Sequence, residues 1–403
     1  MRRILISTSR LPSWPGQRRC SFTPWQQAPH WSIASRRASI VTAEDKPPIA
    51  FRHEDLARMV EEARGPASRR SGIMAGLGQS AYQYAYRSSL RGWSRHVAGR
   101  VRERDGRKGR QSDVDACHLL DLVLEQGGLC AYSGLPMELL KPHSHWRVSI
   151  ERMDSSHGYL KGNCCLVAAE FNSTVHKVGD DTASLAGSAQ WSKQKVWEVV
   201  RARTEQVQLQ GLHGNIAVAR RRPVQTRGSR FNRYRGPHED GTWRCARCGV
   251  WKEVTQFNKQ TASSRGIQSH CKRCNTEFLS AYLQTIRGHG LALLGSARRR
   301  ALTSTKLNGS FDLQLCDLLD MLWLQGGRCY YSGVPLHCAR GPADWVWSLE
   351  RLDNSVTYTK ENCVLIAREF QTSDQSRNKA RYPVFGTAQW SRSKASHVWG
   401  PYF

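Results

Sequence analysis

Apolar and polar residues alternate in a pattern that predicts a short α+β unit. Asp115–Gln126 has apolar positions at helical spacing and ends in a pair of glycines, which predicts a helix that stops there. Trp146–Arg152 alternates as a strand does, Asp154–Gly158 has turn composition, and the chain then leads back. Leu166–Thr174 has helical spacing. The order strand, turn, returning strand and helix predicts a ββα unit.

The same pattern occurs twice, at a fixed offset of 199 residues. Between Gly127 and Phe171, 21 of 45 positions are identical to their partners in Gly326–Phe370. Upstream the offset becomes 196, where Arg91-Gly92 matches Arg287-Gly288 at the start of a basic helix. Solenoid repeats are about 20–50 residues long, so this spacing indicates two copies of one domain.

Composition and charge point to a polyanionic partner. The chain has 403 residues, of which 39% are hydrophobic, enough for packed cores. It holds 60 Lys and Arg against 33 Asp and Glu, a net charge of +27, for which nucleic acid is the expected partner. No run of 18 apolar residues occurs, so no membrane segment is predicted.

The N-terminal segment has the composition of a targeting sequence. Residues 1–43 contain seven Arg, seven Ser and no Asp or Glu. Organelle transit segments share this composition, which predicts targeting to a mitochondrion or plastid. A basic tail that helps to hold nucleic acid, with a nuclear location, is the alternative.

The domain boundaries follow from these shifts in composition. Residues 201–240 contain nine Arg and no Lys, which predicts a linker, either with affinity for phosphate or merely solvated. The predicted segments are a transit segment at 1–45, the first copy at 80–200, the linker at 201–240, a zinc module at 241–280 and the second copy at 281–399.

The zinc module rests on four cysteines in two C-x2-C pairs, Cys245, Cys248, Cys271 and Cys274. A spacer of 22 residues separates the pairs. Each pair brings two thiolates to one tetrahedral ion, and four protein ligands leave no open position for catalysis. The pattern therefore predicts structural Zn²⁺.

Polar residues recur between the copies more closely than packing requires. Ser149–Asn172 and Ser348–Gln371 share S-x-E-R-x-D, then Tyr, then Asn-Cys, then Glu-Phe. A functional site would explain the repeated Glu, Arg, Asp and Asn. The alternative is structural, with ion pairs and a braced hairpin. Tryptophans that recur in register favour core anchors over base-stacking surfaces.

These strings resemble HNH-type (His-Me finger) endonucleases, near the recombination endonuclease VII-like branch. The resemblance covers Cys130–Asn172 and Cys329–Gln371, and the Cys-rich segment resembles zinc modules that accompany such nucleases. It implies a β-hairpin and helix around one divalent ion, with an acidic ligand, a bracing Asn and a second ligand. Those positions correspond to Glu151, Asn163 and Asn172 in the first copy and to Glu350, Asn362 and Gln371 in the second.

The sequence departs from the family at the general base. The family has His directly after the acidic ligand, where this chain has Arg152 and Arg351. Arginine stays protonated, so it cannot be a base but could clamp a phosphate. His157 is a substitute base in the first copy, and hydroxide generated on the metal is another route.

The shared Asp154 and Asp353 could hold the metal or its water. The prediction is thus an α+β chain with two ββα-metal domains, basic flanking helices and a zinc module. Its expected function is a Mg²⁺- or Mn²⁺-dependent endonuclease, on DNA more than RNA, with the first copy more competent. The alternative is a non-catalytic, zinc-containing organellar protein that binds nucleic acid. The oligomeric state stays open, although two copies in one chain could mimic a dimer.

Overall fold

The computed structural model has a mixed α+β fold built from helices and two-stranded antiparallel sheets. It describes residues 47–65, 78–142, 144–172, 191–221, 236–261, 263, 265–303, 309–338, 343–371 and 390–402. The predicted transit segment lies outside these residues, as does 222–235 of the predicted linker. Within the described ranges, no helix is long and apolar enough to cross a membrane.

The first unit contains five helices, one 3-10 turn and one hairpin among the described residues. In chain order they are α1 (His53–Arg64), α3 (Gln79–Arg87), α4 (Leu90–Gly106), α5 (Ala116–Glu125), β1 (Val148–Arg152), η3 (Lys161–Asn163), β2 (Cys164–Ala168) and α6 (Lys193–Thr204). The Asp115 side chain caps α5 by accepting from His118 N, which explains where that predicted helix begins.

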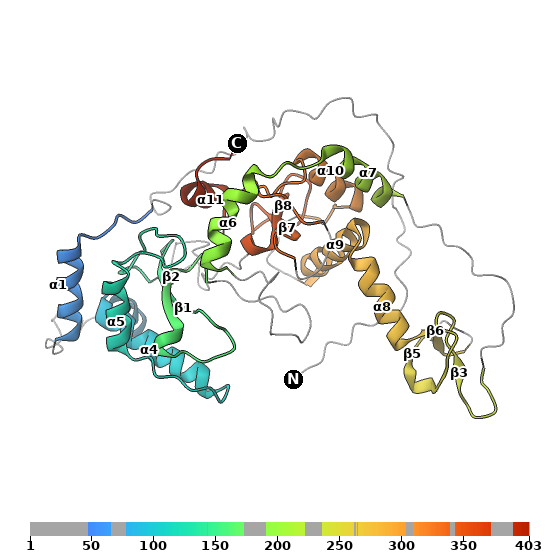
Figure 1. Cartoon of the computed structure of the whole chain (residues 1–403), viewed down its shortest axis with the longest axis horizontal. Helices are drawn as coiled ribbons and strands as arrows, with labels where there is room; N and C mark the ends of the chain where they lie inside the picture. The colour runs from blue at the N-terminus through green and yellow to red at the C-terminus, as the bar shows by residue number, and fades with distance from the viewer. Residues whose placement is uncertain are drawn as a thin grey trace.

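The second unit repeats the order of helices and strands, but its 3-10 turn follows the hairpin. Its elements are α7 (Leu209–Arg220), α8 (Lys272–Leu283), α9 (Ile286–Thr303), α10 (Leu315–Leu324), β7 (Trp347–Arg351), β8 (Cys363–Ala367), η5 (Arg368–Phe370) and α11 (Arg392–Trp399). The hairpins have matching register, since Glu151 pairs with Cys165 and Glu350 with Val364. In Figure 1 the first unit runs from blue to green, and the second unit comprises green α7 and the orange-to-red part of the ribbon.

The Arg-Gly pairs noticed in the sequence form a tight corner in each unit. A Cβ on Gly92 would lie 1.8 Å from Tyr86 O, and one on Gly288 would lie 1.9 Å from Tyr282 O. Only glycine allows this approach of two backbones. The arginine before Gly92, Arg91, donates to Glu62 O and Gly65 O at the end of α1.

The structure corrects the predicted linker. Residues 209–220 form α7, whose Leu212, Ile216 and Ala219 are buried against the second unit. Arg287 donates to Ala219 O, as Arg91 does to the end of α1. Two glycines weaken the intrinsic helix propensity of this segment, so packing against the second unit provides most of the stability of the helix. The second unit therefore begins near residue 207, and the first unit includes α1.

The helix predicted over Leu166–Thr174 is also wrong. Cys164–Ala168 is strand β2, and Ala169–Phe171 is a turn, while residues 173–190 lie outside the described residues. The error has a physical source. A short apolar run fits a buried strand as well as a buried helix, because both faces of β2 are covered.

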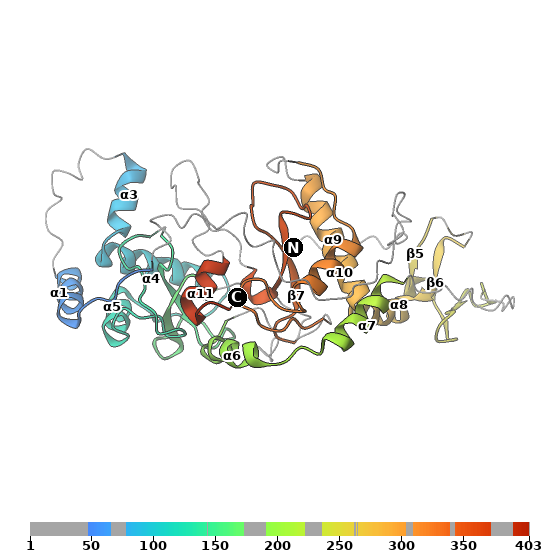
Figure 2. The ribbon, with the colours of Figure 1, turned by 90° about the horizontal axis from the view of Figure 1, so that it is seen from above.

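The zinc module is an insertion within the second unit. It contains β3 (Trp243–Arg244), β4 (Trp251–Lys252), η4 (Val254–Gln256), β5 (Phe257–Lys259) and β6 (Ile267–Cys271). It lies between α7 and α8, at the position where the first unit joins α1 to α3. Both views place it at the end of the molecule opposite α1 (Figures 1 and 2).

The two units exchange their last helices. The Trp191 indole, just before α6, donates to Glu369 O at 3.0 Å, and Trp390, just before α11, donates to Glu170 O at 3.0 Å. Both indoles are 1% exposed, and their ring centroids lie 5.5 Å apart. The predicted core role of these tryptophans is confirmed, and each unit is completed by a helix that follows the other.

Buried ion pairs accompany the exchange. Lys394 Nζ of the second unit lies 2.7 Å from Glu170 Oε1 of the first, and Lys195 Nζ lies 3.2 Å from Glu369 Oε1. Glu170 also accepts from the backbone N–H of Trp146, which has φ 58° although it is not glycine. Lys394 thus supports, through Glu170, the unusual turn that leads into β1.

Candidate functional site

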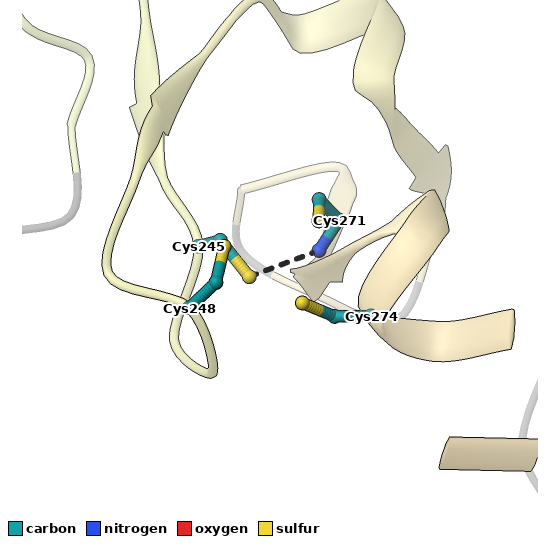
Figure 3. A group of neighbouring side chains, drawn as sticks. All are labelled: Cys245, Cys248, Cys271 and Cys274. Atoms are coloured by element: carbon teal, nitrogen blue, oxygen red, sulfur yellow. Dashed lines mark hydrogen bonds between the residues drawn. The ribbon is translucent and has the colours of Figure 1, made fainter. Parts of the chain in front are cut away.

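Four cysteines form the cluster that the sequence predicted. The Sγ atoms of Cys245, Cys248, Cys271 and Cys274 all lie within 4.8 Å of one another. The first pair flanks the turn between β3 and β4, and the second pair lies at the end of β6 and in the first turn of α8 (Figure 3). In the part of the chain that the structure describes, it is the only group of three or more Cys, His or acidic side chains placed to hold a metal ion.

The surroundings of this cluster favour a thiolate at Cys245, whereas burial and the neighbouring cysteines raise the pKa of Cys274 to about 12. Burial opposes ionisation of Cys245, but N–H groups of Cys248, Cys271 and Arg247 outweigh it and lower the pKa of its thiol to about 6. The Cys271 N–H lies 3.3 Å from Cys245 Sγ, and Lys252 Nζ lies 3.5 Å from Cys271 Sγ. Four sulfur ligands at this spacing suit a tetrahedral ion, so the cluster could hold a metal such as zinc.

The first hairpin loop is held together by Asn163. Its Oδ1 accepts from Asp154 N at 2.8 Å, and its Nδ2 donates to Asp154 O at 2.9 Å and Gly158 O at 3.1 Å. Asn362 makes the equivalent bonds to Asp353 in the second unit, at 2.8 and 2.9 Å. The amide therefore ties the loop to the start of the returning strand in both units.

The two arginines after the glutamates also serve the loop. Arg152 Nη1 donates to Ser155 O at 3.1 Å and His157 O at 2.7 Å. Arg351 Nη1 donates to the corresponding carbonyls of Asn354 and Val356 at 3.0 and 3.1 Å. One nitrogen of each guanidinium is thus committed to ordering the loop.

Asp154 and His157 lie side by side on the exposed part of this loop. The pKa of Asp154 is lowered to about 2 by three hydrogen bonds. The Ser156 hydroxyl has the largest effect, followed by the Ser156 N–H and by His157. His157 Nδ1 lies 2.8 Å from Asp154 Oδ2, and the imidazole is 65% exposed. An ionised Asp154 favours the tautomer with the hydrogen on Nδ1, and in the neutral imidazole that tautomer leaves Nε2 as a proton acceptor.

Asn172 lies at a different place, beside β1, the strand that carries Glu151. Glu151 is 8% exposed, near the end of the strand. Asn172 follows the hairpin, and its Nδ2 donates to Ile150 O at 2.7 Å and Ser149 Oγ at 2.8 Å. No hydrogen bond among the described residues engages Asn172 Oδ1. The amide is therefore held beside the residue that precedes Glu151.

In the second unit the equivalent side chains touch. Gln371 Nε2 lies 3.2 Å from Glu350 Oε2 and donates to Leu349 O at 2.7 Å. The Ser348 hydroxyl donates to Gln371 Oε1 in a short hydrogen bond. Gln371 Oε1 thus accepts a hydrogen bond from serine, whereas Asn172 Oδ1 accepts none from the described residues.

Burial raises the pKa of Glu350 to about 7, although Gln371, Arg351 and Arg300 oppose the shift. A carboxyl whose pKa is raised by folding binds its proton more tightly when folded, so stability falls as pH rises from about 4.5 towards 7. In wild type, Glu350 should lower the free energy of unfolding by up to about 1.4 kcal/mol for each pH unit between these values, and Glu350→Gln should abolish that dependence. Urea unfolding at pH 5 and 7 measures it, and equal pH slopes in wild type and variant would contradict the assignment.

Sequence reasoning missed one partner of the hairpin loop, Arg104 on α4. Its Nη1 donates to the Tyr159 hydroxyl at 2.6 Å, and Arg300 Nη1 lies 3.4 Å from that of Tyr358. Both tyrosines belong to the repeated string, and both arginines recur at the offset of 196 residues. Aligning the helices at that second offset would have found the pair.

The comparisons with known proteins leave the family open, because no family model, curated protein or solved structure matches the chain.

Proposed function

We propose that the chain is a divalent-metal-dependent endonuclease that hydrolyses phosphodiester bonds in nucleic acid, DNA more than RNA. The observation that carries the proposal is that each unit has a mostly buried glutamate on a strand and an amide side chain bonded to the carbonyl of the residue before it. Glu151 and Asn172 are the proposed ligands for Mg²⁺ or Mn²⁺ in the first unit. Their carboxylate and amide oxygens are ligands that such ions prefer.

The proposed roles of the other residues follow from their contacts. The ion, when bound, supplies charge stabilisation for the leaving oxygen. His157, oriented by Asp154 through Nδ1, takes a proton from the attacking water at Nε2. Asn163 and Arg152 keep the loop that carries His157 in place. The net charge of +27 favours a polyanionic substrate.

The second unit is proposed mainly to bind. Val356 stands at the position of His157, so no imidazole lies on that loop. Gln371 has its amide oxygen on Ser348 and its nitrogen on Glu350. A donor N–H facing the carboxylate competes with a cation for the same oxygen, which makes this site the weaker of the two.

A second candidate function has its own support, namely a nucleic-acid-binding protein that retains the fold without catalysis. The four-cysteine cluster is the only group of at least three Cys, His or acidic side chains placed for a metal among the described residues. Within the loop, Arg152 donates to the carbonyls of Ser155 and His157, and Asn163 bonds to the backbone of Asp154. This candidate predicts binding that weakens with salt and no strand breakage in Mg²⁺.

Plasmid nicking in Mg²⁺ and Mn²⁺ distinguishes the two candidates. We expect wild type to nick, Glu151→Gln to abolish nicking, and His157→Ala to slow it by about 10²–10⁴-fold, the usual contribution of a general base. Glu350→Gln is the matched control and should nick at a rate close to wild type. Inactive wild type would favour the binding protein, and loss only in Glu350→Gln would reverse the assignment of the units.

A further inference from the structure

An arginine, a tyrosine and a second arginine stack together beside the first hairpin loop. Tyr159 is 4% exposed, and its ring centroid lies 5.0 Å from Arg152 Cζ and 5.9 Å from Arg104 Cζ. Arg104 also donates to the Tyr159 hydroxyl at 2.6 Å. The ring therefore holds two guanidinium groups close to one another.

The second unit keeps an arginine on the tyrosine ring and another beside its hydroxyl. Arg351 Cζ lies 4.9 Å from the ring centroid of Tyr358, and Arg300 Nη1 lies 3.4 Å from its hydroxyl. The three residues come from a helix, a strand and the loop after it, so local sequence alone does not bring them together. Although Val356 stands at the position of His157 in the second unit, both arginines still contact the tyrosine.

The arginines on the helices have binding capacity to spare. Arg104 is exposed, and beyond the Tyr159 hydroxyl and ring it has no other hydrogen bond or ion pair to the described residues. Arg152, by contrast, already donates from Nη1 to two carbonyls of the loop. A guanidinium held on an aromatic ring presents its remaining N–H groups as a planar fork that matches phosphate geometry.

The position fits a phosphate beside the proposed cleavage site. The charge of Arg300 favours the ionised form of Glu350 and lowers its pKa, and Arg104 is the residue that matches Arg300 at the offset of 196. A cation there would contact a phosphate of the nucleic-acid backbone, next to the phosphodiester bond that is proposed to be cleaved beside the glutamate. A stack that served only to pack the tyrosine would not need an exposed, charged partner.

We propose that Arg104 and Arg300 bind backbone phosphates of the nucleic acid. Tyr159 holds Arg104 with its ring and hydroxyl, and Tyr358 holds Arg300 with its hydroxyl. This inference rests on the proposed function for the identity of its ligand. It assigns the phosphate contact to the arginine on the helix, and it leaves Arg152 and Arg351 as residues that order the loops. Both units then hold the substrate, although one cleaves it.

The salt dependence of binding tests this assignment without any cleavage. Full-length protein is titrated onto a fluorescein-labelled DNA duplex over a range of NaCl concentrations, with no Mg²⁺ or Mn²⁺ added. Each phosphate contact contributes about 0.9 to the slope of log K against log salt concentration. We expect Arg104→Gln/Arg300→Gln to lower that slope by about 1.8.

Three further variants separate a phosphate contact from a structural role. Arg104→Lys/Arg300→Lys keeps both charges and should keep the slope, with weaker affinity because the fork is lost. Arg58→Gln on α1, whose side chain is 67% exposed, removes a charge elsewhere and should leave the slope unchanged. Tyr159→Phe removes the acceptor for Arg104 and should weaken binding.

An unchanged slope in the double Gln variant would overturn the inference. So would equal loss of slope in the Gln and Lys variants, since that points to a disturbed loop. Failure of the proposed function gives a different result. If wild type never cleaves in Mg²⁺ but the slope falls as expected, the phosphate contacts stand without the nuclease. If wild type cleaves and the slope is unchanged, only the phosphate contacts fail.

Discussion

Cys271→Ser is expected to release zinc and to unfold the module between α7 and α8, while both hairpin units stay folded. The core of this module consists of Phe257, Ile267 and three of the cysteines, and is separate from the main core. So small a core cannot offset chain entropy without a staple, and structural zinc supplies about 10–16 kcal/mol of apparent binding energy in zinc-finger peptides.

Elemental analysis and hydrogen exchange together measure this effect. Wild type should contain one zinc ion per chain and protect the amides of β5 and β6, and the variant should show neither. Cys165→Ser is the matched control, because this cysteine lies in β2, outside the cluster. Protected β5–β6 amides in metal-free Cys271→Ser protein would show that the cluster is not structural.

Lys394→Met should destabilise the protein by about 3–5 kcal/mol, although Lys394 belongs to one unit and its partner to the other. The substitution leaves Glu170, which is fully buried, without the ammonium group 2.7 Å away. The loss should spread to the first hairpin, because Glu170 holds the Trp146 turn that leads into β1. Urea unfolding measures the free energy, and hydrogen exchange of β1 and β2 locates the loss.

Two comparisons make this prediction specific. Adding Glu170→Gln to Lys394→Met removes the uncompensated charge and should restore much of the stability. Arg100→Met breaks the exposed Arg100–Glu103 pair and should cost about 0–1 kcal/mol. If Lys394→Met loosens only α11 and leaves the exchange of β1 and β2 amides unchanged, the units are not coupled through the exchanged helices.

The sequence could predict what depends on local chemistry. The C-x2-C pairs identify the four-cysteine cluster, which could hold a metal such as zinc, because ligand type and spacing alone define it. The Asp115 cap and the glycines after Gln126 bound α5, and alternation locates β1. The duplicated Asn163 and Asn362 were predicted to brace their loops, and their hydrogen bonds confirm it.

What the sequence could not predict depends on contacts between distant segments. The exchange of α6 and α11 brings Trp390 to Glu170 across 220 positions, and nothing local to either residue indicates it. Helix α7 contains two glycines and is stabilised by packing. Its low helix propensity therefore gave no sign of a helix in the sequence. The structural alternative for Arg152 also needed coordinates, because only they show which carbonyls its side chain reaches.

Binding of Mn²⁺ to the full-length protein, followed by electron paramagnetic resonance, tests most directly whether Glu151 and Asn172 share a cation. The account predicts a protein-bound Mn²⁺ signal that Glu151→Gln and Asn172→Leu each abolish and that Glu350→Gln leaves in place. A bound signal that persists in both first-unit variants, or no protein-bound Mn²⁺ in wild type, would contradict the account.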